Sequence, residues 1–342
     1  MKAIIQDRYG PPEGLRLAEI DPPSVGPDEV LVRVRAASVH PDVWHVLHGV
    51  PYVLRLMGAG VRRPAQPVPG IDVAGVVAAV GEAVTRFGPG DEVFGETVKG
   101  FQWRNGGAFA EFVAAPEGAL ARKPSGLEFE QAAAVPTSGL IAWSALHQQG
   151  RVKTGDHVLV NGAGGGVGTF VVQLAKAAGA RVTAVDAASK LAALTAIGAD
   201  RVIDYATDDF THGSERYDVI VDIPANHSFT ECRRVLARDG TYVLIGHDGY
   251  GATAGRWLGS LPRVLPLVAL APFRRQLPAV DFSTPDKAAV LAELARRLEA
   301  GELSTVIERT YPLSAAADAI RHLQTGRVTG KVVLTMPPTA AW

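Results

Sequence analysis

Hydrophobic residues follow two different periods along this chain, and the change falls near residue 124. In residues 1–123, short apolar runs alternate with turns rich in Gly and Pro, which is typical of β-strands. The runs that predict strands lie at residues 2–5, 30–36, 73–80, 92–94 and 108–114. We therefore expect a β-rich N-terminal domain.

From about residue 127 the apolar positions recur at helical spacing, first at 129–134 and 139–148, and strands then alternate with helices. Strands are predicted at 181–185, 201–203, 217–222 and 240–246, with helices at 190–197 and 229–236 between them. This alternation predicts an α/β fold with a doubly wound parallel sheet and right-handed crossovers. Ligands of such sheets lie beyond the carboxyl ends of the strands, which makes Gly246 a candidate cofactor contact.

The most informative stretch is 157–186, where a strand, a glycine-rich turn, a helix and a second strand end at Asp186. The turn reads NGAGGGVG over residues 161–168 and is typical of a dinucleotide-binding βαβ unit. We assign the tight reversal to Gly165, the close approach to a pyrophosphate to Gly166, and the helix–strand contact to Gly168. The helix is expected to begin near Val167 and to receive the pyrophosphate at its N-terminus, with Ala163 and Gly164 completing the loop.

Composition narrows the functional classes. The 342 residues carry 34 Lys and Arg against 35 Asp and Glu, so no global field favours nucleic acid or an anionic membrane surface as a partner. The single cysteine, Cys232, allows no intramolecular disulfide and is expected to be a buried, inert thiol. The N-terminus does not read as a signal peptide, so we expect a cytoplasmic protein. An apolar segment at 261–273 is too short to cross a bilayer and is expected to be buried or to face a partner.

Five motifs together resemble the medium-chain dehydrogenase/reductase superfamily. They are PGIDVAGVVAAVGEAVTRFGPGDEVFG (69–95), GGAFAEFV (106–113), EQAAAVPTSGLIAW (130–143), NGAGGGVGTFVVQLAKAAGA (161–180) and GKVVL (330–334). The resemblance implies a GroES-like catalytic domain of residues 1–123 and 305–342, and a Rossmann domain of residues 124–304 that binds NAD(P). It also implies a homodimer, for which the apolar segment at 261–273 is a candidate interface.

The chain departs from the zinc-dependent members of that family. They carry Gly-His-Glu where this chain has Gly70, Ile71 and Asp72, and they carry a cysteine where His40 stands. Because His40 and Asp72 alone are too few ligands for a catalytic zinc, we expect no metal. The chain resembles the zinc-free quinone-oxidoreductase branch, which reduces quinones and α,β-unsaturated carbonyls.

The segment 38–54 resembles the family's substrate-side segment, which commonly has Asn at the position of His40. His40 and Tyr52 are candidate hydrogen-bond donors to a substrate oxygen, and Trp44 is a candidate apolar wall. The alternative for His40 is a structural loop histidine. His45 and His48 are expected to be surface residues.

The sequence does not decide between NAD(H) and NADP(H) as the cofactor. Asp186 is placed to accept a hydrogen bond from a ribose hydroxyl and to repel a 2′-phosphate, which favours NAD(H). Lys190 and Tyr205 align with positions that hold the 2′-phosphate in NADPH-using relatives, and Ser189 offers another donor. The resemblance favours NADP(H), while the alternative for Lys190 is an ordinary surface lysine.

Without a metal to polarise a carbonyl, hydride transfer favours acceptors that spread the incoming charge over a conjugated system. The first hypothesis is therefore an NAD(P)H-dependent reductase of a quinone or an α,β-unsaturated carbonyl. An alcohol or aldehyde dehydrogenase is the second, and a dinucleotide-binding protein without turnover is the third.

Overall fold

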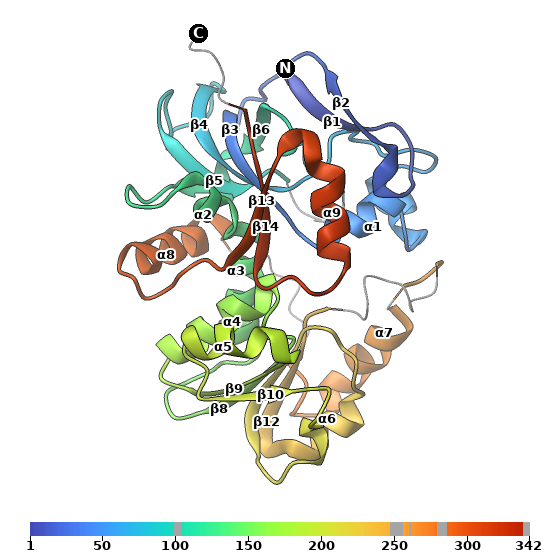
Figure 1. The fold of residues 1–342 in the computed structure, drawn as a ribbon, viewed down its shortest axis with the longest axis vertical. Helices are drawn as coiled ribbons and strands as arrows, with labels where there is room; N and C mark the ends of the chain where they lie inside the picture. The colour runs from blue at the N-terminus through green and yellow to red at the C-terminus, as the bar shows by residue number, and fades with distance from the viewer. Residues whose placement is uncertain (99–103, 247–255, 260, 279–285, 338–342) are drawn as a thin grey trace. The chain divides into compact units, whose positions relative to one another are not determined.

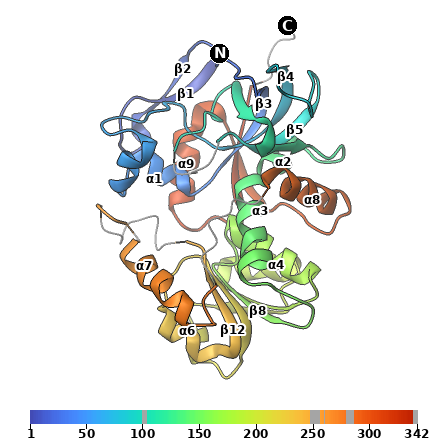
Figure 2. The same ribbon diagram turned by 180° about the vertical axis from the view of Figure 1, so that it is seen from behind.

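The computed structural model describes residues 1–98, 104–246, 256–259, 261–278 and 286–337. The chain forms two compact units, shown in Figures 1 and 2, which we describe separately. The first comprises residues 1–137, 286–301 and 307–342, and the second comprises residues 138–285 and 302–306. The predicted α/β class is confirmed.

The first unit is built on a seven-stranded sheet in the order β13-β14-β3-β4-β5-β7, with β6 paired to β3, and a separate β1-β2 ladder. Its strands are β1 Lys2–Gln6, β2 Leu15–Glu19, β3 Glu29–Val39, β4 Asp72–Val80, β5 Glu92–Glu96, β6 Phe112–Pro116, β7 Leu120–Arg122, β13 Ile307–Pro312 and β14 Lys331–Thr335. Its helices are α1 Asp42–His48, α2 Phe129–Ala133, α8 Lys287–Glu299 and α9 Ala316–Gln324. The C-terminal strand β14 pairs antiparallel with β3, so the end of the chain completes this unit.

The second unit is a five-stranded parallel sheet in the order β10-β9-β8-β11-β12. Its strands are β8 His157–Asn161, β9 Arg181–Asp186, β10 Arg201–Asp204, β11 Tyr217–Asp222 and β12 Leu236–Leu244. Its helices are α4 Gly166–Ala177, α5 Leu191–Ala196, α6 Phe229–Val235 and α7 Leu261–Leu270, while α3 Pro136–Trp143 begins at the boundary of the units. The strand order reverses at β8, where the first crossover begins, as in a dinucleotide-binding sheet.

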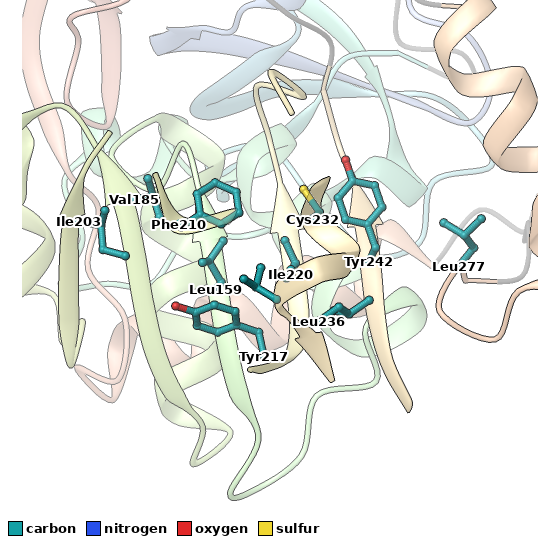
Figure 3. Close-up of a cluster of buried hydrophobic side chains, with 11 residues drawn as sticks. Leu159, Val185, Ile203, Phe210, Tyr217, Ile220, Cys232, Leu236, Tyr242 and Leu277 are labelled. Atoms are coloured by element: carbon teal, nitrogen blue, oxygen red, sulfur yellow. The ribbon is translucent and has the colours of Figure 1, made fainter. Parts of the chain in front are cut away.

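The core of the second unit explains why its strands are continuous apolar runs. Parallel strands are covered on both faces, so both sets of alternating side chains are buried. Leu159 of β8 and Ile220 of β11 lie in one cluster with Tyr242 of β12 and Cys232 of α6 (Figure 3). Cys232 is fully buried, and this burial raises the pKa of its thiol, as expected for an inert residue.

The units divide the chain at points that differ from the predicted domain boundaries of 124 and 304. Helix α2 packs against β3 and β4, which places residues 124–137 with the first unit. Helix α8 packs against β7, and its Lys287 pairs with Glu96 of β5. Sequence periodicity cannot show which sheet a helix covers, because the contacts join residues nearly two hundred positions apart.

Candidate active site

The turn after β8 makes its tight reversal at Gly162, which has a φ of +78°. The amide of Gly162 donates to the carbonyl of Val185 at 3.0 Å, which ties the turn to the neighbouring strand β9. The assignment of this reversal to Gly165 was wrong. Gly165 has an extended backbone with φ −81°, and a Cβ there would find its nearest neighbour at 3.6 Å.

The contact between α4 and the turn requires Gly168, as expected. A Cβ at Gly168 would lie 2.4 Å from the carbonyl oxygen of Gly162 and 2.5 Å from that of Ala163. Helix α4 begins at Gly166, and the amides of its first turn, which includes Val167, have no acceptor within the helix. The residues present therefore fit a pyrophosphate at this helix end, where free amides and the helix dipole favour an anion.

Asp186 ends β9 and is held by three donors. Its Oδ2 accepts from the amide of Gly164 at 2.7 Å, and its Oδ1 accepts from the amide of Ala187 at 2.8 Å. The ammonium of Lys190 lies 3.3 Å from Oδ1, and both side chains are buried. Lys190 is thus not a surface lysine. A Cβ at Gly164 would lie 2.6 Å from the Lys190 side chain, so this glycine makes room for the pair.

Two other predicted cofactor residues, Ser189 and Tyr205, lie beside this pair in the second unit. Ser189 is exposed in the turn that precedes Lys190, and the Tyr205 ring is 59% exposed. The amide of Tyr205 donates to the carbonyl of Asp186 at 3.3 Å. Gly246 lies apart from them, after β12, where a Cβ would meet the carbonyl oxygen of Ile223 at 2.1 Å.

A buried polar group beside the loop was missed by the sequence analysis. Asp222, the last residue of β11, accepts from the Asn161 amide at 2.8 Å and from the Tyr242 hydroxyl at 2.7 Å. Burial raises the pKa of Asp222, and burial together with the nearby Asp222 raises the pKa of the Tyr242 hydroxyl. These bonds brace the carboxyl ends of β8 and β11. A polar residue that ends each of two neighbouring apolar strands was the available signal.

In the first unit, His40 follows β3 directly and is 6% exposed. Its Nδ1 accepts from the amide of Asp42 at 3.3 Å, and one carboxylate oxygen of Asp42 is also 3.3 Å away. Its Nε2 is buried and has no hydrogen-bond partner. A buried polar atom without a partner is costly, and one place where it is kept is a ligand site.

The remaining candidates of this segment lie on and after α1. Trp44 is half-buried and its ring lies 4.7 Å from that of His48. Tyr52 is also half-buried, and the Arg55 guanidinium lies over its ring at 4.6 Å. The expectation that His45 and His48 are surface residues was wrong: His45 is buried with its Nδ1 3.0 Å from the carbonyl of Val50, and His48 is half-buried. Burial lowers the pKa of His48.

A row of buried polar side chains crosses the same sheet. Ser38, Asp72 and Glu96 are direct neighbours on β3, β4 and β5. Asp72 Oδ2 accepts from the Ser38 hydroxyl at 2.6 Å and lies 3.3 Å from the Lys331 ammonium. The Thr137 hydroxyl lies 2.5 Å from Asp72 Oδ1 and 2.8 Å from Glu96 Oε1.

These contacts decide whether a zinc ion could bind at Asp72, the position where the resemblance places a metal ligand of zinc-dependent dehydrogenases. Both Asp72 oxygens already accept hydrogen bonds, and the Lys331 ammonium supplies the positive charge. Burial lowers the pKa of Lys331, while the Asp72 carboxylate opposes this effect. In the described part of the chain, no group of three or more His, Cys, Asp or Glu side chains could hold a metal. The residues present do not fit a catalytic zinc.

Two family models match this chain. One, described as an alcohol dehydrogenase GroES-like domain, matches residues 26–125, and the other, described as a zinc-binding dehydrogenase, matches residues 197–334. The 2-methylene-furan-3-one reductase of Solanum lycopersicum is 32% identical over 98% of this chain and 79% of its own length. The chain therefore belongs to the medium-chain dehydrogenase/reductase superfamily.

Solved structures that resemble this chain indicate its branch within the superfamily. The quinone oxidoreductase from Coxiella burnetii is 29% identical with a TM-score of 0.80, over 98% of this chain and 99% of that one. A structure named NAD-dependent alcohol dehydrogenase is 33% identical with a TM-score of 0.80, over 98% of this chain and all of that one. This protein is a medium-chain oxidoreductase of the quinone-oxidoreductase-like branch. No helix within the described ranges is long and apolar enough to span a membrane.

Proposed function

We propose that this protein uses NAD(P)H, without a metal, to reduce a quinone or an α,β-unsaturated carbonyl. The relatives named for quinone and furanone reduction support this acceptor class. The glycine loop with Gly168 and the N-terminus of α4 support the dinucleotide. The single observation that carries the proposal is the unpartnered, buried Nε2 of His40.

The hydrogen bonds of His40 determine what its Nε2 can do. When Nδ1 accepts a hydrogen bond from the amide of Asp42, the proton of a neutral ring lies on Nε2. In a protonated ring Nε2 also carries a proton, and Nδ1–H then faces the Asp42 carboxylate. We assign to His40 a form with a proton on Nε2, in which Nε2–H is a donor for an oxygen of the substrate.

This donor matches the charge that develops during the proposed reduction. A bound reduced nicotinamide would supply the hydride for the acceptor carbon. As the new C–H bond forms on the acceptor, an electron pair of the conjugated system moves onto its oxygen, and the proton that completes the reduction comes from solvent. A hydrogen bond from His40 to that oxygen stabilises the transition state more than the ground state.

We further propose that NADP(H) is preferred, because the Lys190 ammonium offsets the negative charge of Asp186 and could pair with a 2′-phosphate. The internal pairing of Asp72 with Lys331 supports a metal-independent reaction. A homodimer in the cytoplasm is the assembly and location that we propose with this activity, and sedimentation velocity tests the assembly.

Steady-state rates with an enone and a quinone test the role of His40. We expect His40→Ala to lower kcat/KM by about a hundredfold, as for the loss of one oxyanion donor. NADPH affinity, measured by fluorescence titration, should stay unchanged. His40→Asn keeps an N–H donor and should restore part of the rate, whereas the control His48→Ala should resemble the wild type.

Three outcomes would contradict the proposal. Wild-type rates in both His40→Ala and Tyr52→Phe would remove these donors from the mechanism. Zinc-dependent oxidation of simple alcohols, without enone or quinone reduction, would establish the alcohol dehydrogenase alternative that one relative's name suggests. Binding of NADPH without turnover of any acceptor would indicate a non-catalytic protein.

A further inference from the structure

Helix α7 and the residues beside it expose an unusual number of large apolar side chains. Trp257 is 74% exposed, Leu265 57% and Phe273 81%. The other exposed apolar residues of the segment 256–275 are Leu258, Leu261, Val268 and Leu270. We call this surface the α7 face. The segment was expected to be buried or to face a partner; the first alternative is wrong, because α7 contains no buried residue.

The helix is nevertheless attached to its own unit. Leu267 and Ala271 pack against the hydrophobic cluster that includes Tyr242 (Figure 3). After the helix, the carbonyl of Gln276 accepts from the amide of Tyr242 at 2.8 Å, and the Gln276 amide donates to the carbonyl of Ala237 at 3.1 Å. In both ribbon views α7 lies beside α6 (Figures 1 and 2). One side of α7 is thus anchored, and the other presents apolar side chains to the outside.

The charged residues of the segment 256–275 all have the same sign. The segment 256–275 contains four arginines and no Asp or Glu, although the whole chain is nearly neutral. All four are exposed, and they are Arg256, Arg263, Arg274 and Arg275. The near-zero net charge, on which the expectation of no membrane partner was based, does not reveal this local concentration.

The positive charge and the apolar side chains of the α7 face together distinguish between two partners that could cover it, a second copy of the chain and a lipid surface. A twofold dimer pairs a patch with its own copy, so the four arginines of one copy would approach the four arginines of the other. An anionic lipid surface offers the opposite charge at its headgroups and an apolar layer beneath them. We propose that the α7 face docks on an anionic membrane surface.

The dimensions of the segment fit this mode of binding. An α7 of ten residues is about 15 Å long, which is too short to cross a bilayer but suits a helix lying in the interface. Trp257 and Phe273 flank it and would enter the boundary between headgroups and acyl chains. The arginines would remain among the headgroups, with their apolar stems against the helix.

Sedimentation of the full-length protein with lipid vesicles tests the proposal without any measurement of turnover. We expect binding to vesicles of phosphatidylcholine with about 30% phosphatidylglycerol in low salt, and much weaker binding to phosphatidylcholine alone. The triple variant Arg263→Gln, Arg274→Gln, Arg275→Gln should bind about a hundredfold more weakly, at about fivefold for each arginine near the surface. Added salt should weaken the wild type far more than this variant.

Two further variants decide the matter. The triple variant Arg216→Gln, Arg238→Gln, Arg327→Gln removes the same charge from exposed positions elsewhere and should bind like the wild type. The variant Leu265→Gln, Phe273→Gln should lose vesicle binding and keep its oligomeric state. Absence of binding to anionic vesicles, or equal loss in both arginine variants, would overturn the proposal. So would dissociation of an oligomer by Leu265→Gln, Phe273→Gln, because the face would then be covered by a second copy.

Discussion

Replacing Lys190 should change the choice between the two nicotinamide cofactors. Its ammonium lies 3.3 Å from the Asp186 carboxylate in a buried position at the end of β9. Lys190→Met keeps the apolar stem but leaves the carboxylate with its two backbone donors alone. A 2′-phosphate would then meet an uncompensated negative charge, whereas the ribose hydroxyl of NADH would still find an acceptor.

The size of the effect follows from the geometry. At 3.3 Å the bare attraction of the pair is about 5 kcal/mol for an effective dielectric constant of about 20, which is an upper limit because burial opposes it. A hydrogen bond between charged groups contributes about 1.5–3 kcal/mol net. Since 1.4 kcal/mol is a factor of ten, the preference for NADPH over NADH should fall by about tenfold to a hundredfold.

Initial rates at subsaturating cofactor, with one fixed acceptor, give the ratio of kcat/KM for NADPH to that for NADH. Asp186→Asn should raise this ratio, because it removes the charge that opposes the phosphate. Lys176 is a suitable control, since it belongs to α4 of the same unit and pairs with Asp200 at 2.8 Å near the surface. An unchanged ratio in Lys190→Met, or an equal fall in Lys176→Met, would refute the reasoning.

Three other substitutions test the packing and the electrostatics. Gly168→Ala should abolish NADPH binding in a calorimetric titration, because the new methyl group would meet loop carbonyl oxygens at 2.4 and 2.5 Å, whereas Gly118→Ala has open space and should bind normally. Thr137→Val should lower the free energy of unfolding of the first unit by about 1–3 kcal/mol in denaturant titrations, because the buried carboxylate of Asp72 loses a donor, and Thr137→Ser should be close to the wild type. Glu293→Gln should lower stability at pH 7 by at most about 1 kcal/mol, since the pair is partly exposed. The two arginines that follow Glu293 in α8 lower its pKa to about 2, so its stabilisation is present above the unfolded value near 4.5 and disappears as the pH falls through about 2. Thermal unfolding of Glu293→Gln and wild type should therefore converge in strong acid, and a difference that persists there would contradict the assignment.

The dinucleotide loop was largely predictable, because its signal is local. A strand, a glycine cluster and a helix in sequence define the turn, and Gly168 has the predicted role. The reversal was assigned to Gly165 rather than Gly162 because a run of adjacent glycines does not show which one adopts a positive φ. Lys190 is buried because the chain turns sharply between β9 and α5, and spacing alone does not reveal whether such a lysine faces solvent.

The contacts of the first unit were not predictable in the same way. Asp72 meets Ser38, Thr137 and Lys331, which lie 34, 65 and 259 positions away in the chain. A sequence shows that an acid occupies a strand, but only the sheet register identifies its partners. The orientation of α7 could not be predicted from the sequence for the same reason. Its apolar pattern was visible, yet whether Leu265 faces the core or solvent depends on what packs against the helix.

Each unit contains a buried acid–lysine pair that sets the local charge at a predicted ligand position. Lys331 neutralises Asp72 in the segment where zinc-dependent relatives carry a metal ligand, and Lys190 neutralises Asp186 where the ribose of the cofactor is expected. Taken alone, the Asp72 carboxylate suggests a metal ion as ligand. The Asp186 carboxylate alone suggests a ribose without a 2′-phosphate. Each pair is proposed to have the opposite consequence, because the Lys331 ammonium supplies positive charge beside Asp72 and the Lys190 ammonium would offer a partner to a 2′-phosphate. On this proposal, cofactor preference depends on Asp186 and Lys190 together, and Lys190 is the residue whose removal should change it.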